Sequence, residues 1–129
     1  MSEYIDEPTG RCDTDAVHCG EQRWLGSLTT PIALTSTFVF KDMNEVQAFG
    51  QGQADHYEYG RYGNPTREAA ERKLAVLENA DRCILFDSGM SAVSATLMAL
   101  CSQGQHLVIT DDAYKQTLNI VTKILPRFG

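Results

Sequence analysis

Two short apolar runs constrain the fold of this chain more than any other feature of its sequence. Residues 83–86 and 106–110 are each the length of a strand that is buried on both faces. Residues 90–101, which lie between them, carry almost no charge and predict a helix packed between a sheet and other structure. This β-α-β order predicts an α/β fold with a mostly parallel sheet.

The sheet that these runs predict is incomplete. A further helix is expected over residues 114–125, with Pro126 ending it and Gly129 standing where a next strand would begin. Two parallel strands with their helices do not usually bury enough surface to be stable alone, because a parallel sheet needs cover on both faces. We therefore expect the first part of a larger domain.

The sequence before residue 83 predicts an arm and an irregular segment. Residues 1–26 are polar and mixed, which is typical of an extended arm with at most a short helical turn around residues 13–19. Residues 29–40 favour either a strand or an irregular extended segment. A short helix is expected to begin at Asn44 and to end by Gly50, and a glycine-rich loop then continues to Asn64.

The best-marked helix follows this loop. Asn64 is expected to cap it, Pro65 suits its first turn, and Asn79 is expected to end it. Apolar residues at helical spacing predict its buried face, namely Ala70, Leu74 and Leu77. Charged residues predict the face in water, namely Arg67, Glu71 and Lys73.

The charge balance disfavours some classes of partner. The chain has 17 acidic and 11 basic residues, with no block of like charge, so a nucleic-acid or anionic-membrane partner has little support. No apolar run approaches the ~20 residues that a membrane-spanning helix requires. A small-molecule ligand fits this composition better.

The cysteines and histidines suggest neither disulfides nor a metal. The four cysteines have irregular spacing, with no C-x-x-C pair and no secretory leader, and we expect reduced thiols in the cytoplasm: Cys12, Cys19, Cys83 and Cys101. The histidines lack the spacing at which side chains converge on a metal, so no metal site is expected: His18, His56 and His106.

The turn over residues 87–90 joins the first apolar run directly to a helix. The free N–H groups of the first helical turn and the helix dipole favour a phosphate, Gly89 lets an anion approach the backbone, and Ser88 adds a hydroxyl donor. Many strand-to-helix turns contain Gly or Ser for geometry and capping alone. The turn by itself leaves both interpretations open.

Two further places carry candidate ligand-binding residues. Arg61 stands between Tyr59 and Tyr62, and its fork of donors is suited to a phosphate, with the Tyr59 hydroxyl as another donor. Tyr114 follows the second apolar run, at the edge where open α/β sheets collect ligands, and its ring is suited to stack on a flat cofactor. The alternatives are a solvent-facing turn and an amphipathic tyrosine that starts a helix.

Several motifs occur in an order and spacing that are highly specific: residues 16–20, 31–32, 35–38, 59–66 and 88–90, and Tyr114. From about Asp13 to Gly129 the chain resembles the N-terminal portion of the cysteine/methionine-metabolism enzymes that depend on pyridoxal 5'-phosphate (PLP), the trans-sulfuration enzymes. The family includes cystathionine γ-synthase, cystathionine lyases, methionine γ-lyase and O-acetylhomoserine sulfhydrylase, and residues 59–66 favour the first.

This resemblance implies a fold and a chemistry. The fold is that of a fold-type I PLP-dependent transferase, with residues 1–58 as an N-terminal arm and irregular segment and residues 59–129 as the start of the large PLP-binding domain. The implied substrates are sulfur amino acids or homoserine esters. The implied assembly is a homo-oligomer whose active site is shared between subunits.

The resemblance also implies roles for individual residues. The pair matching Tyr59 and Arg61 reaches the PLP phosphate of the neighbouring protomer. The turn matching Ser88, Gly89 and Met90 binds the phosphate within its own protomer, and Asp87 replaces the small residue common before it in the family. The tyrosine matching Tyr114 stacks on the pyridine ring and assists proton movement, which makes it the candidate catalytic residue.

Family chemistry requires a lysine that holds the cofactor, an aspartate that pairs with the pyridine nitrogen, and an arginine for the substrate carboxylate. These are expected beyond Gly129, because the lysines present lack the surroundings that the family uses: Lys41, Lys73, Lys115 and Lys123. We therefore expect this chain to be inactive alone. The alternative is a non-catalytic module that binds phosphate or pairs with complete subunits.

Overall fold

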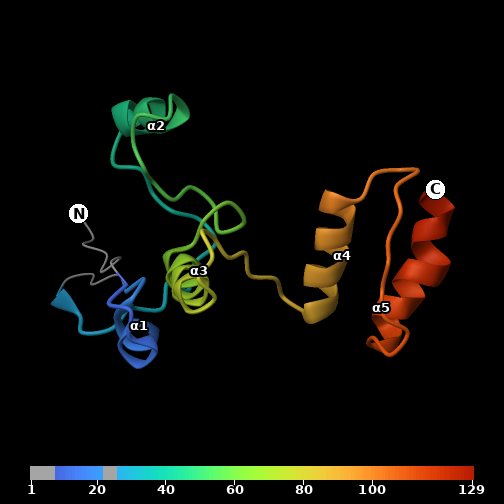
Figure 1. The fold of residues 1–129 in the computed structure, drawn as a ribbon. Coiled ribbons are helices and arrows are strands. Elements are labelled where there is room, and N and C mark those ends of the chain that lie inside the picture. Colours follow the sequence, from blue (N-terminus) through green and yellow to red (C-terminus); the bar gives the residue numbers. More distant parts are fainter. Residues whose placement is uncertain (1–7, 22–25) are drawn as a thin grey trace. The chain divides into compact units, whose positions relative to one another are not determined.

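The computed structural model describes residues 8–21 and 26–129, which form two units that divide after Ile84. The first unit contains the helices α1 (Cys12–His18), α2 (Met43–Gly50) and α3 (Pro65–Leu77) (Figure 1). The second contains α4 (Gly89–Leu100), α5 (Lys115–Asn119), the π-helical η2 (Ile120–Ile124) and the 3-10 helix η3 (Leu125–Phe128). None of the described helices has the length and apolar character needed to cross a membrane.

Two helices of the first unit, α2 and α3, begin at polar caps. Asn64 caps α3, as predicted, because its Oδ1 accepts hydrogen bonds from the N–H groups of Thr66, at 2.9 Å, and Arg67, at 3.4 Å. Asp42 caps α2 in the same way, so this helix begins one residue before the predicted Asn44. The short helix predicted around residues 13–19 is also present, as α1.

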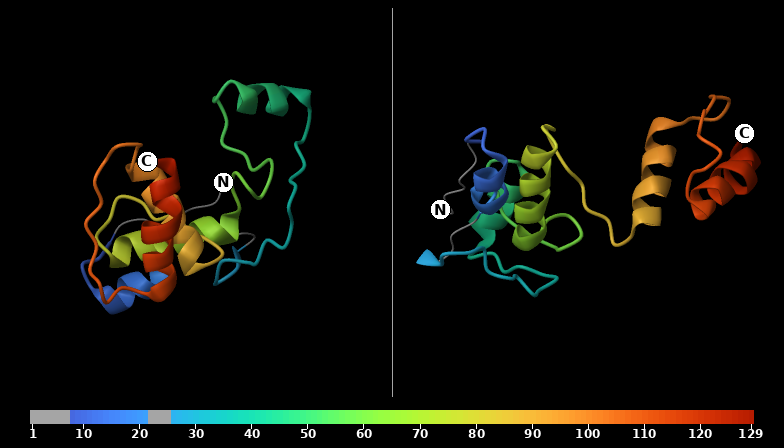
Figure 2. Two further views of the ribbon diagram at one scale, coloured as in Figure 1. Left: turned by 90° about the vertical axis from the view of Figure 1, so that its right-hand side faces the viewer. Right: turned by 60° about the horizontal axis from the view of Figure 1, so that its bottom comes forward.

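α1 and α3 lie side by side and bury small residues between them (Figures 1 and 2). Cys19 is only 2% exposed, and Ala69 and Ala75 are also buried. A Cβ atom on Gly20 would lie 2.9 Å from the Ala69 carbonyl oxygen, so the chain passes α3 more closely than a side chain allows. Lys73 secures the contact, because its Nζ donates to the Val17 carbonyl at 2.7 Å.

The predicted faces of α3 are wrong. Leu74 and Leu77 are exposed, whereas the buried residues of α3 are Pro65, Ala69 and Ala75. The three charged residues expected in water each contact protein groups: Arg67, Glu71 and Lys73. Only short side chains fit against α1, and the long charged side chains reach from the helix to carbonyls and counter-charges on either side.

The segment over residues 31–40 remains largely irregular and pairs with the glycine-rich loop through a single β-bridge. Thr37 and Tyr59 form an isolated antiparallel bridge. The Phe38 N–H donates to the Glu58 carbonyl at 3.0 Å, and the Gly60 N–H donates to the Ser36 carbonyl at 2.7 Å. These bonds align the start of the Tyr59–Tyr62 loop with residues 36–38.

In the second unit, α4 and α5 lie side by side and start from the same end (Figures 1 and 2). At that end the Thr117 hydroxyl lies 3.9 Å from the Met90 sulfur, and at the other end the Gly104 N–H donates to the Gly129 carbonyl at 2.7 Å. α4 agrees with its prediction to within one residue. Pro126 does not end the final helix, because a proline in the first turn of η3 loses no hydrogen bond.

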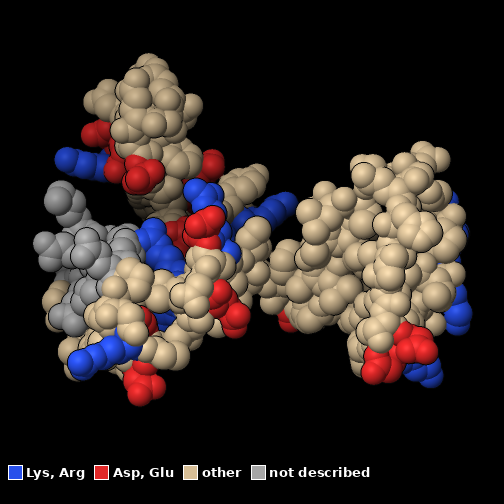
Figure 3. Space-filling model, viewed as in Figure 1, with Lys and Arg blue, Asp and Glu red and all other residues tan. Residues whose placement is uncertain are grey.

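The two predicted buried strands are the main error of the sequence analysis. Both runs are extended, but across residues 8–21 and 26–129 the only β pairing is the bridge at Thr37, and no parallel sheet forms. Ile84 is 72% exposed and Val108 is 86% exposed. Figure 3 also shows few charged side chains on the drawn face of the second unit, in keeping with an α4 that has none. The apolar pattern identifies strands that need neighbours, and the described residues provide none.

Candidate functional site

Arg61 lies on an aromatic platform in the loop before α3. Its guanidinium carbon is 5.2 Å from the centroid of the Tyr59 ring, and the Tyr59 and Tyr62 rings meet edge to face at 6.1 Å. Tyr59 is half-buried, whereas Arg61 is exposed, and among the described residues no ion pair involves its guanidinium. A cation held on a ring and open to water is suited to receive an anion.

The backbone of this loop is held by Arg67, from the first turn of α3. Its Nη1 atom donates to the carbonyls of Gly60 and Arg61, each at 3.4 Å, and its Nη2 atom donates to the Tyr62 carbonyl at 3.2 Å. The sequence pattern predicted that Arg67 faces water, so this role was not foreseen. The available signal was its position three residues after the Asn64 cap, because helical side chains lean back toward the amino end.

The start of α3 also holds the segment before the loop. The Asn64 side-chain amide donates to the Ala33 carbonyl at 3.1 Å. The Thr66 hydroxyl accepts from the Ala33 N–H at 2.8 Å and donates to the Pro31 carbonyl at 3.3 Å. One turn of helix therefore fixes two stretches of chain that are distant in sequence.

The predicted phosphate-binding turn stands at the start of α4. The Ser88 Oγ accepts from the Ser91 N–H at 3.1 Å and lies 2.9 Å from the Ser91 Oγ, so Ser88 caps the helix. A Cβ atom on Gly89 would meet nothing within 4 Å, which leaves open space beside the backbone. Asp87 is exposed at this turn. The first helical N–H groups have no partner within the helix, so an anion is able to approach them.

Tyr114 lies at the same end of the second unit as this turn. It precedes α5 directly, is 66% exposed, and stands three residues before Thr117, whose hydroxyl contacts Met90. The structure therefore brings together the second unit's predicted site residues at one end: Ser88, Gly89, Met90 and Tyr114. Tyr59 and Arg61 belong to the first unit. The binding roles of all six stay predictions.

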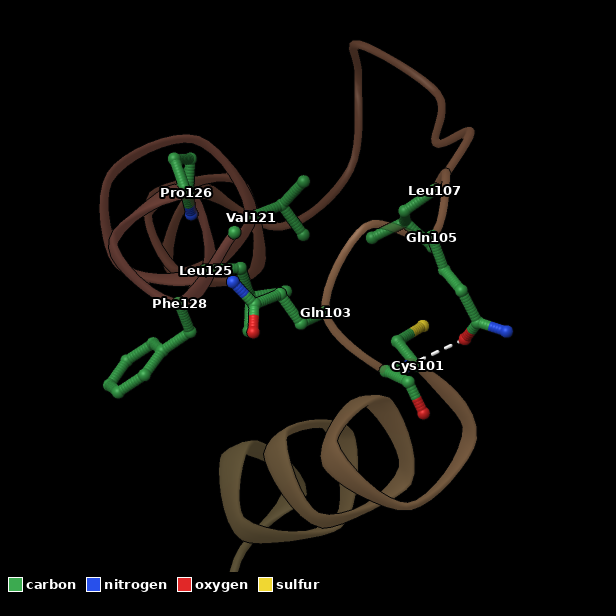
Figure 4. Close-up of a pocket in the computed structure, with 10 residues that line it drawn as sticks. Cys101, Gln103, Gln105, Leu107, Val121, Leu125, Pro126 and Phe128 are labelled. Carbon is green, nitrogen blue, oxygen red and sulfur yellow. Dashed lines mark hydrogen bonds between the residues drawn. The ribbon is translucent and has the colours of Figure 1, made fainter.

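The second unit also has a cavity of about 270 Å³, at the opposite end of α4 (Figure 4). Cys101, Gln103 and Gln105 line it from the end of α4 and the following turn, and Val121, Leu125 and Phe128 line it from the C-terminal helices. Its lining includes no charged side chain. It therefore lacks the charged donors that bind a phosphate most strongly. Within the described residues no three His, Cys, Asp or Glu side chains are grouped to hold a metal ion.

Comparisons with known proteins identify the class to which this arrangement belongs. Cystathionine gamma-synthase 1 of Nicotiana tabacum is 39% identical over 118 residues, which are 88% of this chain and 22% of that protein. Cystathionine beta-lyase MetC of Bacillus subtilis is 41% identical over 81% of this chain and 24% of that protein. The chain thus spans about a quarter of each of these relatives.

A solved structure shows the same similarity in three dimensions. The metY protein of Campylobacter jejuni, which contains N'-pyridoxyl-lysine-5'-monophosphate, matches with a TM-score of 0.81 and 26% identity over 92% of this chain and 30% of that chain. These relatives define a class of PLP-dependent enzymes. Residues 13–129 match the family described as Cys/Met metabolism PLP-dependent enzyme, and the chain belongs to this family. The expected PLP dependence of the family is confirmed.

Proposed function

We propose that this chain supplies the phosphate-gripping and ring-covering part of a PLP enzyme that acts on sulfur amino acids or homoserine esters. The observation that carries the proposal is the exposed Arg61 guanidinium on the Tyr59 ring, within a chain of the Cys/Met family. When bound, PLP supplies an electron sink for carbanions formed on the amino acid. The residues of this chain bind and orient the cofactor.

The turn before α4 fits a phosphate. It offers open space at Gly89, unpartnered helical N–H groups and the positive end of a helix that spans 12 residues. The Ser88 Oγ accepts from the Ser91 N–H and shares a hydrogen bond with the Ser91 hydroxyl, so one of the two hydroxyl protons is left to donate to an anion. Asp87 opposes an anion unless its carboxylate points away, and its exposure to water weakens that repulsion.

Tyr114 fits the flat ring of the cofactor. Its side chain is largely exposed at the same end of the unit as the turn, so one face of the phenol ring is available for stacking. We assign the movement of a proton near the bound amino acid to its hydroxyl. Tyr114→Phe keeps the stacking ring and removes that hydroxyl, so it separates the two roles.

Tyr59 and Arg61 act, in this proposal, on the phosphate held by a second copy of the chain in a homo-oligomer. Arg61→Ala should then weaken binding of a phosphate ester in assembled material more than in isolated protomers. Calorimetric titration with pyridoxine phosphate, which has no aldehyde, measures this binding on both fractions. Arg82→Ala is the matched control, because Arg82 is also exposed but lies after α3. An equal loss in both fractions would remove the assignment across subunits.

The lysines of the chain provide a separate test. Lys73 is engaged with the Val17 carbonyl and lies 3.7 Å from Glu21, so it is poorly placed to hold a cofactor. We propose that no lysine of this chain is the catalytic one. Mixing the chain with PLP, reducing with borohydride and mapping the product by mass spectrometry should find no single lysine modified stoichiometrically. One fully modified lysine would contradict the proposal.

The reaction and the location belong to the proposal as well. A synthase and a β-lyase both resemble this chain at about 40% identity, so the stretch does not distinguish them. We favour γ-replacement on a homoserine ester. The assay, on a complete subunit that contains this stretch, compares the products formed from O-succinylhomoserine plus cysteine with those formed from cystathionine. All four cysteines are free, which supports a reducing compartment, and we propose the cytoplasm. Fractionation of cells that express the tagged chain tests the location.

A further inference from the structure

We propose that Arg67 is a positioning residue that fixes the backbone of the Tyr59–Tyr62 loop and thereby sets the direction of the Arg61 side chain. The positioning itself depends only on contacts within the first unit. Its consequence for phosphate rests on the proposed function. The two parts therefore call for separate measurements.

The contacts of Arg67 explain why its effect reaches Arg61. The Arg67 guanidinium binds three consecutive carbonyls, and the middle one belongs to Arg61. From the other side, the N–H groups of Tyr62 and Gly63 donate to the Tyr59 carbonyl at 2.9 and 3.1 Å. A peptide group held at both its oxygen and its neighbouring N–H groups has little freedom to rotate, so the Cα–Cβ direction of Arg61 is fixed.

The geometry requires arginine at this position. While Nη1 and Nη2 bind the loop, the third nitrogen, Nε, lies 3.5 Å from the Glu71 carboxylate one turn along α3. The guanidinium is planar, so these interactions together determine its orientation. A lysine ammonium carries the same charge but is a single compact centre, which cannot bridge three carbonyls and Glu71 at once.

The conservative variant Arg67→Lys tests the positioning, with Arg82→Lys as the matched control. We expect hydrogen exchange at the Tyr62 and Gly63 amides to become roughly tenfold faster, the size expected when hydrogen bonds to a charged group are lost. The Arg61 Nε–H resonance should also move toward its free-peptide position, because the guanidinium leaves the ring current of Tyr59. The Cys19 amide, which donates to the Asp15 carbonyl at 3.1 Å, should keep its protection.

The outcomes separate this proposal from the proposed function. Unchanged exchange and an unchanged Arg61 resonance in Arg67→Lys would overturn the positioning role. Faster amide exchange and a shifted Arg61 resonance, together with weaker binding of inorganic phosphate, would support the positioning role of Arg67 and the proposed phosphate binding. The same changes in a chain whose phosphate affinity is insensitive to Arg61→Ala would support positioning and remove the phosphate role.

A milder variant provides a second test in case Arg67→Lys unfolds the first unit. If Arg67→Lys exposes the Cys19 amide as well, Glu71→Gln removes the charge facing Nε and leaves the three carbonyl bonds in place. We expect this variant to accelerate hydrogen exchange at the Tyr62 amide less than threefold. Its Arg61 Nε–H resonance should keep part of the displacement that the ring current of Tyr59 causes. Full protection of the loop in Glu71→Gln together with a native Arg61 resonance would show that the carbonyl bonds suffice. Acceleration confined to Cys19 would overturn the proposal.

Discussion

Gly20 is the residue at which the first unit tolerates a side chain least. Its φ is +72°, and an added Cβ atom would lie 2.8 Å from the Arg72 Cβ and 2.9 Å from the Ala69 oxygen. Gly20→Ala should lower the free energy of unfolding by about 2 to 4 kcal/mol, because a left-handed backbone and a forced separation of the helices both contribute. Denaturant titration followed by far-ultraviolet circular dichroism measures the loss.

Gly52→Ala is the control for the backbone part of this cost. Gly52 has a φ of +68°, but an added Cβ atom would meet nothing within 4 Å. Gly52→Ala should therefore lower the free energy of unfolding by only about 1 to 2 kcal/mol. Equal losses of unfolding free energy in the two variants would show that α1 and α3 adjust freely. That result would contradict the close contact between Gly20 and α3.

Asp15 makes the amino end of α1 sensitive to acid. This residue is only 5% exposed, and the Thr9 hydroxyl and Thr9 N–H, which donate to its Oδ1 at 2.7 and 2.8 Å, lower the pKa of Asp15 below its ordinary value of 3.8. The ionised carboxylate thus stabilises the fold above that value, and this contribution is lost as the pH falls through the lowered pKa.

Thr9→Val should reduce the part of this stabilisation that comes from the hydroxyl. We expect lower stability than the parent chain at pH 7 and a difference that narrows steadily as the pH falls below about 4. Urea titrations at several pH values measure it, with Thr29→Val as the control at an exposed threonine. A difference that is constant with pH would contradict the link to Asp15.

At the scale of elements, the cap of α3 joins a helix to a distant segment. Asn64→Ala removes the cap and also the bond to Ala33, so we expect a loss of about 1 to 2 kcal/mol in the free energy of unfolding. Asp42→Ala removes only the cap of α2 and should cost about 1 kcal/mol. Thermal and urea unfolding measure the stability of the two variants. A larger loss of unfolding free energy in Asp42→Ala than in Asn64→Ala would refute the additional role of Asn64.

The same elements show what sequence patterns predict and what they do not. Helix starts were predicted to within one residue, because a cap such as Asn64 and a first-turn proline such as Pro65 act on residues a few positions away. The end of the last helix was missed, because it continues through Pro126 to Phe128. The strands were wrong, because pairing depends on neighbours distant in sequence. Tyr59, Arg61 and Tyr114 were singled out from their motif, and their binding roles stay predictions. The contact of Arg67 with three carbonyls was not predicted, because it depends on how the loop turns back over α3.

At the scale of the whole molecule, exposed apolar segments are the dominant surface feature. Ile84 and Val108 stand in extended segments with little cover. The chain should therefore bind the dye ANS and associate as its concentration rises, because exposed apolar surface is favourably removed from water. Fluorescence and sedimentation velocity measure the two effects.

The double variant Ile84→Lys with Val108→Lys should reduce both dye binding and association. Gln53→Lys adds a charge at an exposed polar residue and should change neither by a comparable amount. If Gln53→Lys acts as strongly as the double variant, net charge rather than apolar surface governs the association.

The bond between Lys73 and the end of α1 has a practical consequence for labelling. PLP is an aldehyde and forms adducts with accessible amines, so the exposed lysines should accumulate background modification: Lys41, Lys115 and Lys123. Lys73 has its amine on the Val17 carbonyl and should resist. A pyridoxyl tag found on Lys73 would therefore mark molecules in which the two helices had parted, and its rate of appearance would time that opening.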